Sequence, residues 1–255
     1  SGIPVLLIHG WSQAYMCWSK QYNSERMQKF RMVAFDLRGH GMSDAPLGDQ
    51  FYNDSQLWAE DVHAVLTGLQ LEKAILVGWS YGGLVMTDYV RSYGDEAISG
   101  INFVGAAIQL NEAVMGTMIG PGFLEHFEGA TSEDKTRNRR AMEDFLEDCF
   151  SVPLEKGDFE QALKWNLAVR PDVRLSLASR DVDASAVVGK INVPTLITQG
   201  LEDKTVLPAM AESITTHAKN CSASWYEGVA HAPFLEDTER FNKELEEFVI
   251  SSYND

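Results

Sequence analysis

Residues 78–83 read GWSYGG, and two apolar runs flank them, AILV at 74–77 and LVM at 84–86. This order is typical of a buried strand, a tight turn and a helix. Glycines stand two residues before and two residues after Ser80, where they allow strand and helix to cross closely and the serine to adopt a strained backbone. The pattern Gly-x-Ser-x-Gly therefore predicts a nucleophilic serine at the apex of the turn. The alternative interpretation is an ordinary turn with a serine N-cap.

Other apolar runs of strand length alternate with helical patterns along the chain. We expect strands at 3–8, 32–35, 74–77, 98–104, 193–200 and 223–226. We expect helices at 18–30, 55–69, 83–93, 208–217 and 241–250. Strands that alternate with helices are joined by right-handed crossovers and form a mainly parallel sheet. The predicted fold class is therefore α/β, with a doubly wound sheet.

Residues 105–188 have a different character. Their Met, Phe and Leu residues fall at helical spacings that Gly, Pro and Asp interrupt, and we find no convincing strand among them. We expect a helical cap, inserted into an α/β core that comprises residues 1–104 and 189–255. Apolar stripes on such helices usually form core, but the inner face of a cap would also line a ligand pocket.

The chain of 255 residues has a net charge of −16 and a sequence pI near 4.7. A basic surface drives phosphate binding, so nucleic acid is not an expected partner, and anionic membranes are disfavoured for the same reason. No apolar run approaches the roughly 18 residues of a membrane span. One short basic cluster interrupts the acidic character, and we interpret it as a solvated helix face: Lys135, Arg137, Arg139 and Arg140.

Cysteine usage and the start of the chain bear on its compartment. Cys17, Cys149 and Cys221 are too few and too widely spaced for a disulfide scaffold, so we expect free thiols. No Cys-x-x-Cys pair or His/Cys cluster indicates zinc. The apolar run at 3–8 is short and lacks a positive lead and a cleavage site, so it does not match a secretory signal. These features predict a cytoplasmic protein.

Residues that follow different strands of a parallel sheet meet at its carboxyl edge. Ser80, Asp203 and His231 each follow a predicted strand, and they occur in the chain order serine, acid, histidine. In such a triad Ser80 would attack a carbonyl, His231 would take its proton and pass it to the leaving alcohol, and Asp203 would orient the imidazole.

The oxyanion that develops on the attacked carbonyl needs hydrogen-bond donors. We expect these to be the backbone N–H groups of Trp11, after the first strand, and Tyr81, at the start of the elbow helix. Trp79 and Tyr81 point in alternate directions, so at most one of them should face the pocket. The remaining histidines and two aspartates of the loop at 36–44 are expected to lie on helices or to support the scaffold: His40, His63, His126, His217, Asp36 and Asp44.

Five segments together resemble the α/β-hydrolase superfamily, in its small, cap-bearing serine esterase branch. They are HGW at 9–11, DLRGHGMS at 36–43, GWSYGG at 78–83, GLED at 200–203 and VAHAP at 229–233. The resemblance implies an α/β-hydrolase fold and assigns the triad acid to Asp203 rather than Glu202. The superfamily usually places two strands before the one that carries His-Gly, and here that strand begins at residue 3. We therefore expect the N-terminal strands to be missing from the sequence or the sheet to be smaller.

The same motifs are similar to those of carboxylesterases that cleave the methyl ester of pimeloyl-acyl carrier protein. Those enzymes use basic cap residues against an acidic carrier protein. The net charge of −16 opposes such a partner unless Arg137, Arg139 and Arg140 form a local basic patch.

The leading functional hypothesis is a serine hydrolase that cleaves a small or medium carboxylic ester through an acyl-enzyme, without metal or cofactor. Two alternatives use the same triad. One is a cofactor-free perhydrolase or haloperoxidase-like enzyme, whose loop after His-Gly usually continues with proline where this chain has Ser12. The other is a hydrolase of carbon–carbon bonds. A non-catalytic ligand-binding receptor is a further alternative, and the intact triad argues against it.

Overall fold

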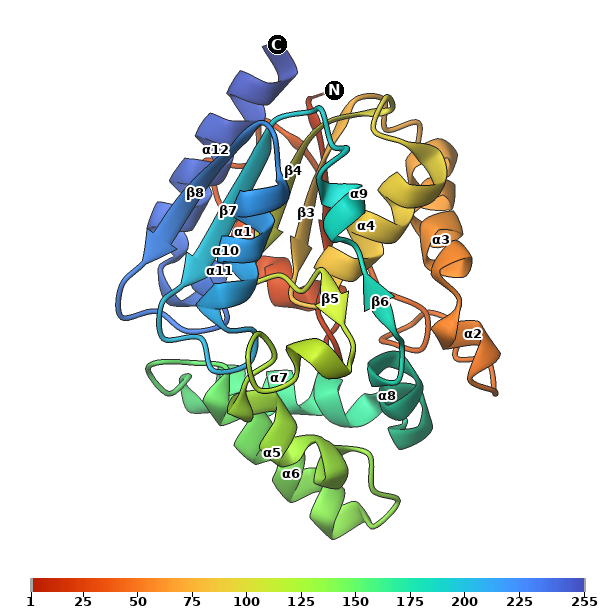
Figure 1. The fold of residues 1–255 in the computed structure, drawn as a ribbon. Helices are drawn as coiled ribbons and strands as arrows, with labels where there is room; N and C mark the ends of the chain where they lie inside the picture. The colour runs from red at the N-terminus through yellow and green to blue at the C-terminus, as the bar shows by residue number, and fades with distance from the viewer. Residues whose placement is uncertain (1, 255) are drawn as a thin grey trace.

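A computed structural model describes residues 2–254 of the chain (Figure 1). Its centre is a six-stranded sheet with the order β2-β1-β3-β4-β7-β8, and all of these strand pairs are parallel. The strands are β1 (Pro4–Ile8), β2 (Arg31–Phe35), β3 (Ala74–Trp79), β4 (Ile98–Val104), β7 (Thr195–Gly200) and β8 (Cys221–Tyr226). The predicted α/β fold with a mainly parallel sheet is confirmed, and each expected strand is present to within two residues at either end.

Helices cover both faces of the sheet. One face carries α3 (Ser55–Gly68), which the short α2 (Gln50–Asn53) precedes, α4 (Gly82–Tyr93), α9 (Ser185–Val188) and α10 (Pro208–His217). The other face carries α1 (Ser19–Tyr22), α11 (Pro233–Glu236) and α12 (Thr238–Asn254). No helix within residues 2–254 is both long and apolar enough to cross a membrane.

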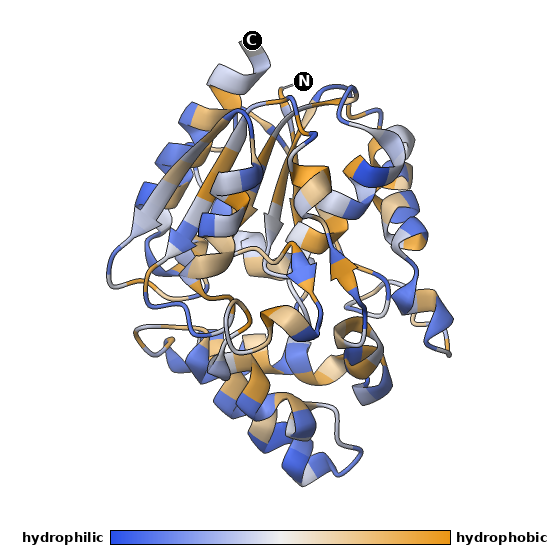
Figure 2. Ribbon diagram, in the orientation of Figure 1, coloured by the Kyte–Doolittle hydropathy of each residue, from blue (hydrophilic) through white to orange (hydrophobic). Residues whose placement is uncertain are grey.

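A hydrophobic core lies on each face of the sheet, and alternate residues of each central strand pack into one core or the other. In β1, Leu6 and Ile8 belong to the core under α3 and α4, while Val5 and Leu7 belong to the core under α12. Because a strand covered on both sides exposes neither face, its sequence is apolar throughout. Figure 2 shows the result, with hydrophobic residues along the central strands and hydrophilic residues on the outer faces of the helices.

The prediction of a helix at 18–30 is wrong. The chain forms a 3-10 helix, η1 (Tyr15–Trp18), and the single turn of α1, and then continues in turns. These turns are closed by bonds from Met27 N to Ser24 O and from Phe30 N to Met27 O, both 3.0 Å long. Met27 and Phe30 are buried under α12 all the same. The apolar spacing was a sign of burial alone, and short polar side chains after α1 favour turns over a continued helix.

Four helices lie together beyond the carboxyl ends of the strands (Figure 1): α5 (Pro121–Ala130), α6 (Lys135–Asp148), α7 (Lys156–Ala168) and α8 (Pro171–Ala178). They fall within the segment expected to form the cap. The expectation of no strand at 105–188 is wrong, because β5 (Gln109–Leu110) pairs antiparallel with β6 (Val182–Asp183). Two-residue strands are too short to produce a detectable alternation. The short η2 (Glu112–Val114) follows β5, and the division into core and cap stays a prediction.

A fully buried arginine joins the cap helices. Arg174, on α8, donates to the carbonyl oxygens of Ala130 and Asn166, each at 2.6 Å, near the C-terminal ends of α5 and α7, and to Asn138 Oδ1 at 3.1 Å. The carbonyl dipoles at a helix C-terminus favour a cation there. Burial lowers the pKa of Arg174 to about 10, so it remains charged at neutral pH. Its own carbonyl oxygen accepts from Trp11 Nε1 at 3.2 Å, which connects the cap to the loop after β1.

Candidate active site

The turn between β3 and α4 holds Ser80 in a left-handed conformation, with a φ of +55°. Its glycines are required by the packing. A Cβ added at Gly78 would lie 2.5 Å from Met86 Cε, and one added at Gly82 would lie 2.6 Å from Ile8 O. The carbonyl oxygen of Ser80 accepts from Gly83 N at 2.9 Å and from the amide of residue 107 at 3.0 Å, which fixes the turn. The backbone is that of a nucleophile elbow.

The acid and the histidine of the predicted triad are in direct contact. Asp203 Oδ2 lies 2.7 Å from His231 Nδ1, and both side chains are buried. Asp203 Oδ1 accepts from the backbone N–H groups of Thr205 (2.8 Å) and Val206 (3.0 Å), and Gln199 Nε2 donates to Oδ2 at 3.2 Å. With its carboxylate fixed by these donors, Asp203 can hold the imidazole in the tautomer that leaves Nε2 free to accept a proton.

The competing acid, Glu202, is exposed and lies outside this network. Its backbone N–H donates to Val229 O at 2.9 Å, so it supports the loop that carries His231 through the main chain alone. Asp203, and not Glu202, is therefore the carboxylate in contact with His231, while its role as the triad acid stays a prediction.

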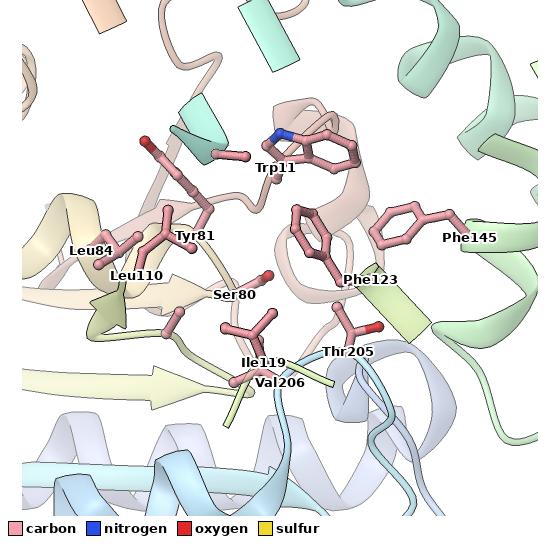
Figure 3. Close-up of a pocket in the computed structure, with 12 residues that line it drawn as sticks. Trp11, Ser80, Tyr81, Leu84, Leu110, Ile119, Phe123, Phe145, Thr205 and Val206 are labelled. Carbon is pink, nitrogen blue, oxygen red and sulfur yellow. The ribbon is translucent and has the colours of Figure 1, made fainter. Parts of the chain in front are cut away.

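The chain at the end of β4 lies between Ser80 and His231 and contacts both. Ser80 N donates to Val104 O at 3.0 Å, and a Cβ added at the next residue, Gly105, would lie 3.3 Å from His231 Nδ1. Within residues 2–254, Ser80 Oγ makes no hydrogen bond to His231, and the hydroxyl points into a cavity instead (Figure 3). Hydrogen bonds of this kind commonly tighten only when substrate binds.

The side chains on either side of Ser80 point in opposite directions, as predicted. Tyr81 lines the cavity next to Ser80 (Figure 3). Trp79 turns the other way, where its Nε1 donates to His231 O at 2.8 Å and its ring lies against Phe234. The residue before Ser80 therefore holds the loop that carries His231.

Both expected oxyanion donors are free. Among the hydrogen bonds of residues 2–254, none uses the backbone N–H of Trp11 or of Tyr81. The loop after β1 also lies against the elbow, because a Cβ added at Gly10 would be 2.9 Å from Ser80 Cβ. Two unpaired N–H groups thus lie on either side of Ser80 in a buried place, where an unpaired donor is costly unless it has a ligand.

Two buried histidines support the loop that contains Trp11. His9 Nε2 accepts from Leu37 N at 3.0 Å, and His40 Nε2 accepts from Ser12 N at 3.1 Å. Burial lowers the pKa of His9 to about 4 and that of His40 to about 3, so both rings are neutral and can accept. His40 has the scaffolding position expected of it.

The other residues predicted to be structural have such positions too. Asp36 Oδ1 accepts from Tyr15 N at 2.8 Å and Oδ2 from Met42 N at 2.9 Å, so this carboxylate organises its own loop. His63, His126 and His217 lie on α3, α5 and α10, and none of them lines the cavity.

The cavity beside Ser80 is small and apolar, with a volume of about 40 Å³ (Figure 3). Its wall comes from the elbow, the loop after β1, the cap and the loop after β7, and none of its residues is charged: Trp11, Ser80, Tyr81, Leu84, Ala107, Leu110, Ile119, Phe123, Phe145, Ala178, Thr205 and Val206. Phe123 of α5 and Phe145 of α6 meet the Trp11 ring edge to face, with centroids 5.2 and 5.3 Å away. Helices α5 and α6 therefore close this side of the site with aromatic rings.

A model of the alpha/beta hydrolase family matches residues 5–244. The chain belongs to the alpha/beta hydrolase family.

Individual relatives of this alpha/beta hydrolase include enzymes of more than one kind. The solved structure of an esterase from a Rhodococcus species is 36% identical, with a TM-score of 0.92, over 98% of this chain and 91% of that one. A non-heme chloroperoxidase from Kitasatospora aureofaciens is 27% identical over 97% of this chain and 92% of its own length. A pimeloyl-[acyl-carrier protein] methyl ester esterase from Aliivibrio fischeri is 27% identical over 97% and 94%.

Several residues of this hydrolase site were not identified from sequence. Phe123 and Phe145 lay in apolar stripes that suit core and pocket equally, and only their packing on Trp11 separates the two interpretations. Thr205, which lines the cavity, could have been identified as a site residue, because it lies two residues after Asp203 in the same loop. Arg180, which binds the Tyr81 hydroxyl at 3.1 Å, had no signal, because a lone arginine in a cap is expected at the surface. Within residues 2–254, no group of three or more His, Cys, Asp or Glu side chains could hold a metal ion.

Proposed function

We propose that this alpha/beta hydrolase cleaves carboxylic esters through an acyl-enzyme on Ser80. The observation that carries the proposal is the buried pair of Asp203 and His231, 2.7 Å apart, beside a serine whose backbone is strained and whose hydroxyl faces an apolar cavity. A strained serine of this kind is typical of a catalytic nucleophile.

The reaction begins when Ser80 Oγ attacks the ester carbonyl carbon while His231 Nε2 takes the serine proton. A turn of the Ser80 side chain brings Oγ towards His231. The negative charge on the carbonyl oxygen is stabilised by the free N–H groups of Trp11 and Tyr81. As the intermediate collapses, the carbon–oxygen bond to the alcohol breaks and His231 protonates the departing oxygen.

Water completes the cycle. His231 takes a proton from a water molecule, whose oxygen attacks the acyl carbon and passes through a second tetrahedral intermediate. The bond to Ser80 Oγ breaks, the serine regains a proton from His231, and the carboxylic acid leaves. Asp203 orients the imidazole and stabilises its charged form in both halves of the reaction.

The cavity favours a short, uncharged acyl group. Its 40 Å³ would hold about three water-sized groups. A charged substituent would lose its hydration without gaining a counter-ion, since no charged residue lines the wall. We therefore propose acetyl to butyryl esters as the substrate class.

A chain-length series of p-nitrophenyl esters, from acetate to octanoate, tests the proposal with wild type and Ser80→Ala. We expect kcat/KM to be highest for the shortest acyl groups, and Ser80→Ala to lose about 10⁴-fold or more. Full ester cleavage by Ser80→Ala would refute the mechanism.

Perhydrolysis is the second candidate, because one relative is a non-heme chloroperoxidase. In that reaction hydrogen peroxide replaces water as the nucleophile that attacks the acyl-enzyme, and the product is a peroxyacid. Ser12 argues against it: its φ of +58° is one that proline, present in that loop of typical perhydrolases, cannot adopt. Measurement of peroxyacid formed from acetate and peroxide separates the two activities. The carbon–carbon hydrolase and the receptor remain alternatives with no specific observation in their favour.

We propose a small-molecule ester as the partner and no carrier protein. The basic cluster on α6 is offset by acids of α5 and α6, since Arg137 pairs with Glu128 and Arg139 with Glu143. An acidic carrier would have to displace these pairs. Nucleic acid and membranes are likewise not proposed as partners.

We also propose a cytoplasmic location, supported by three cysteines that are free thiols, of which Cys17 and Cys149 are buried. Cell fractionation followed by an antibody against the protein tests this.

A further inference from the structure

A buried ion pair ties the cap to the residue that follows the nucleophile. Arg180 lies between α8 and β6, where the cap returns to the core. Its guanidinium binds the carboxylate of Asp88 on α4, and both side chains are 0% exposed. It also donates to the Tyr81 hydroxyl at 3.1 Å and to Ser55 Oγ, at the start of α3, at 2.9 Å.

Tyr81 is therefore held at its far end by the cap. Its hydroxyl accepts from Arg180 and donates to Leu177 O on α8, at 3.3 Å. Its ring lies edge to face with Trp58, at 5.9 Å between centroids, and Arg180 lies 5.7 Å from the Tyr81 ring. At the other end of the same residue is the N–H proposed as an oxyanion donor.

This arrangement is not explained by stability. Burial of two charges costs free energy that their attraction often fails to recover, and apolar replacements of such pairs are frequently as stable. Here Asp88 Oδ1 and Arg180 Nε have no hydrogen-bond partner among the described residues, which adds to the cost. Burial also raises the pKa of Tyr81 to about 12, so its hydroxyl stays neutral and available for both hydrogen bonds.

We propose that Arg180, fixed by Asp88, is a positioning residue that holds Tyr81 so that its N–H points at the reacting carbonyl oxygen and its ring forms the cavity wall. The inference rests on the proposed ester hydrolysis, because it assigns the Tyr81 N–H to the oxyanion. It extends that function by giving the cap a part in the chemical step.

Two variants separate positioning from stability. Tyr81→Phe removes both hydroxyl contacts and leaves the ion pair intact. The double variant Arg180→Met with Asp88→Leu removes both charges together, so neither is left buried and unpaired. The matched control is Arg170→Met with Asp172→Leu, which removes another cap pair. Arg170 donates to Ala45 O at 2.7 Å and pairs with Asp172, and Tyr81 is not among its hydrogen-bond partners.

The expected result is a fall in kcat of about 10- to 100-fold in both Tyr81→Phe and the Arg180/Asp88 variant, with KM changed by less than about threefold. Melting temperatures within a few degrees of wild type show that the fall is not partial unfolding. The Arg170/Asp172 control is expected to keep kcat. Wild-type kcat in both test variants, or an equal loss in the control, would overturn the proposal.

A crystal structure of the Arg180/Asp88 variant supplies a readout that needs no turnover. We expect the Tyr81 ring and backbone to shift from their wild-type position, and an unchanged Tyr81 would refute the inference. A different result would refute the proposed function itself, namely ester cleavage that survives in Ser80→Ala.

Discussion

Ser80 has a left-handed backbone, a conformation that costs a residue with a side chain about 1–3 kcal/mol. The turn around Ser80 fits only because glycines stand two residues before and two residues after it, and a methyl group at Gly82 would collide with Ile8 O. The strain turns the hydroxyl into the cavity at the amino end of α4. The backbone at this residue is therefore better explained by reactivity than by folding.

Asp203 offers the sharpest single-residue prediction. Asp203→Asn retains the size of the side chain but removes the charge that favours the correct His231 tautomer, so kcat should fall by about 10⁴-fold. Glu202→Gln makes the same chemical change one residue earlier, at an exposed side chain, and should leave kcat within about twofold. Steady-state kinetics on p-nitrophenyl acetate measures both. A larger loss in Glu202→Gln than in Asp203→Asn would move the acid to the other residue.

The positions of Ser80, Asp203 and His231 could be predicted because each follows a strand, and parallel strands bring such residues to one edge. Their hydrogen bonds could not be predicted in detail, since Gln199 reaches Asp203 with its side chain from the end of β7 and Thr205 does so with a backbone N–H of the loop. Arg174 and Arg180 could not be predicted at all. Their partners come from distant parts of the chain, and only the folded cap removes their charges from water.

Among the elements, α5 and α6 determine the size of the cavity through Phe123 and Phe145. Phe145 lines the cavity and meets Trp11 edge to face at 5.3 Å. A smaller side chain there would extend the space available to the acyl group.

Phe145→Ala should move the preference to longer acyl chains, with kcat/KM for hexanoate rising relative to acetate by about 10-fold or more, as burial of two or three further CH₂ groups supplies binding free energy. The free energy of unfolding should fall by about 3–5 kcal/mol. Phe127→Ala, on α5 but outside the cavity wall, is the matched control and should keep the wild-type profile. An unchanged profile in Phe145→Ala would show that this ring does not limit the acyl site.

Most strands and helices could be predicted because their periodicity persists over enough residues. Two errors have physical causes. Residues 18–30 have apolar spacing like that of a helix, but Met27 and Phe30 reach the core from consecutive turns. The ribbon of β5 and β6 has two residues in each strand, below the length at which alternation is visible.

Across the whole molecule, the cap is joined to the loop that carries Asp203. Backbone bonds run from Gly120 N to Thr205 O, from Gly122 N to Lys204 O and from Leu207 N to Met118 O, each 2.9 Å long. Residues 118–122 thus hold the loop that carries Asp203, and Ile119 among them lines the cavity. Its helical content could be predicted, whereas this pairing could not, because main-chain contacts between loops leave no periodic pattern.

The stability of the molecule should depend on pH through His9 and His40. Burial lowers the pKa of His9 to about 4 and of His40 to about 3, against about 6.5 in the unfolded chain. Between the folded and the unfolded pKa values, the unfolded chain binds more protons at these two histidines than the folded protein does. The free energy of unfolding therefore rises with pH in this range, and the contribution of the two histidines is lost progressively as pH falls below about 6.5.

His40→Gln should remove one of the two histidines that take up a proton on unfolding. Urea unfolding between pH 4.5 and 7 should then show a slope shallower than that of wild type, by up to about 1.4 kcal/mol per pH unit. Identical slopes in the two proteins would mean that His40 does not titrate on unfolding.

Covalent labelling tests the central claim most directly. Wild type, Ser80→Ala and His231→Asn are incubated with a p-nitrophenyl phosphonate, and the adduct is located by mass spectrometry of the peptides. We predict one adduct, on Ser80 of the wild type, with labelling about 10³-fold slower or more in His231→Asn and absent in Ser80→Ala. An unlabelled wild type, or an adduct that persists in Ser80→Ala, would contradict the assignment of Ser80 as the nucleophile.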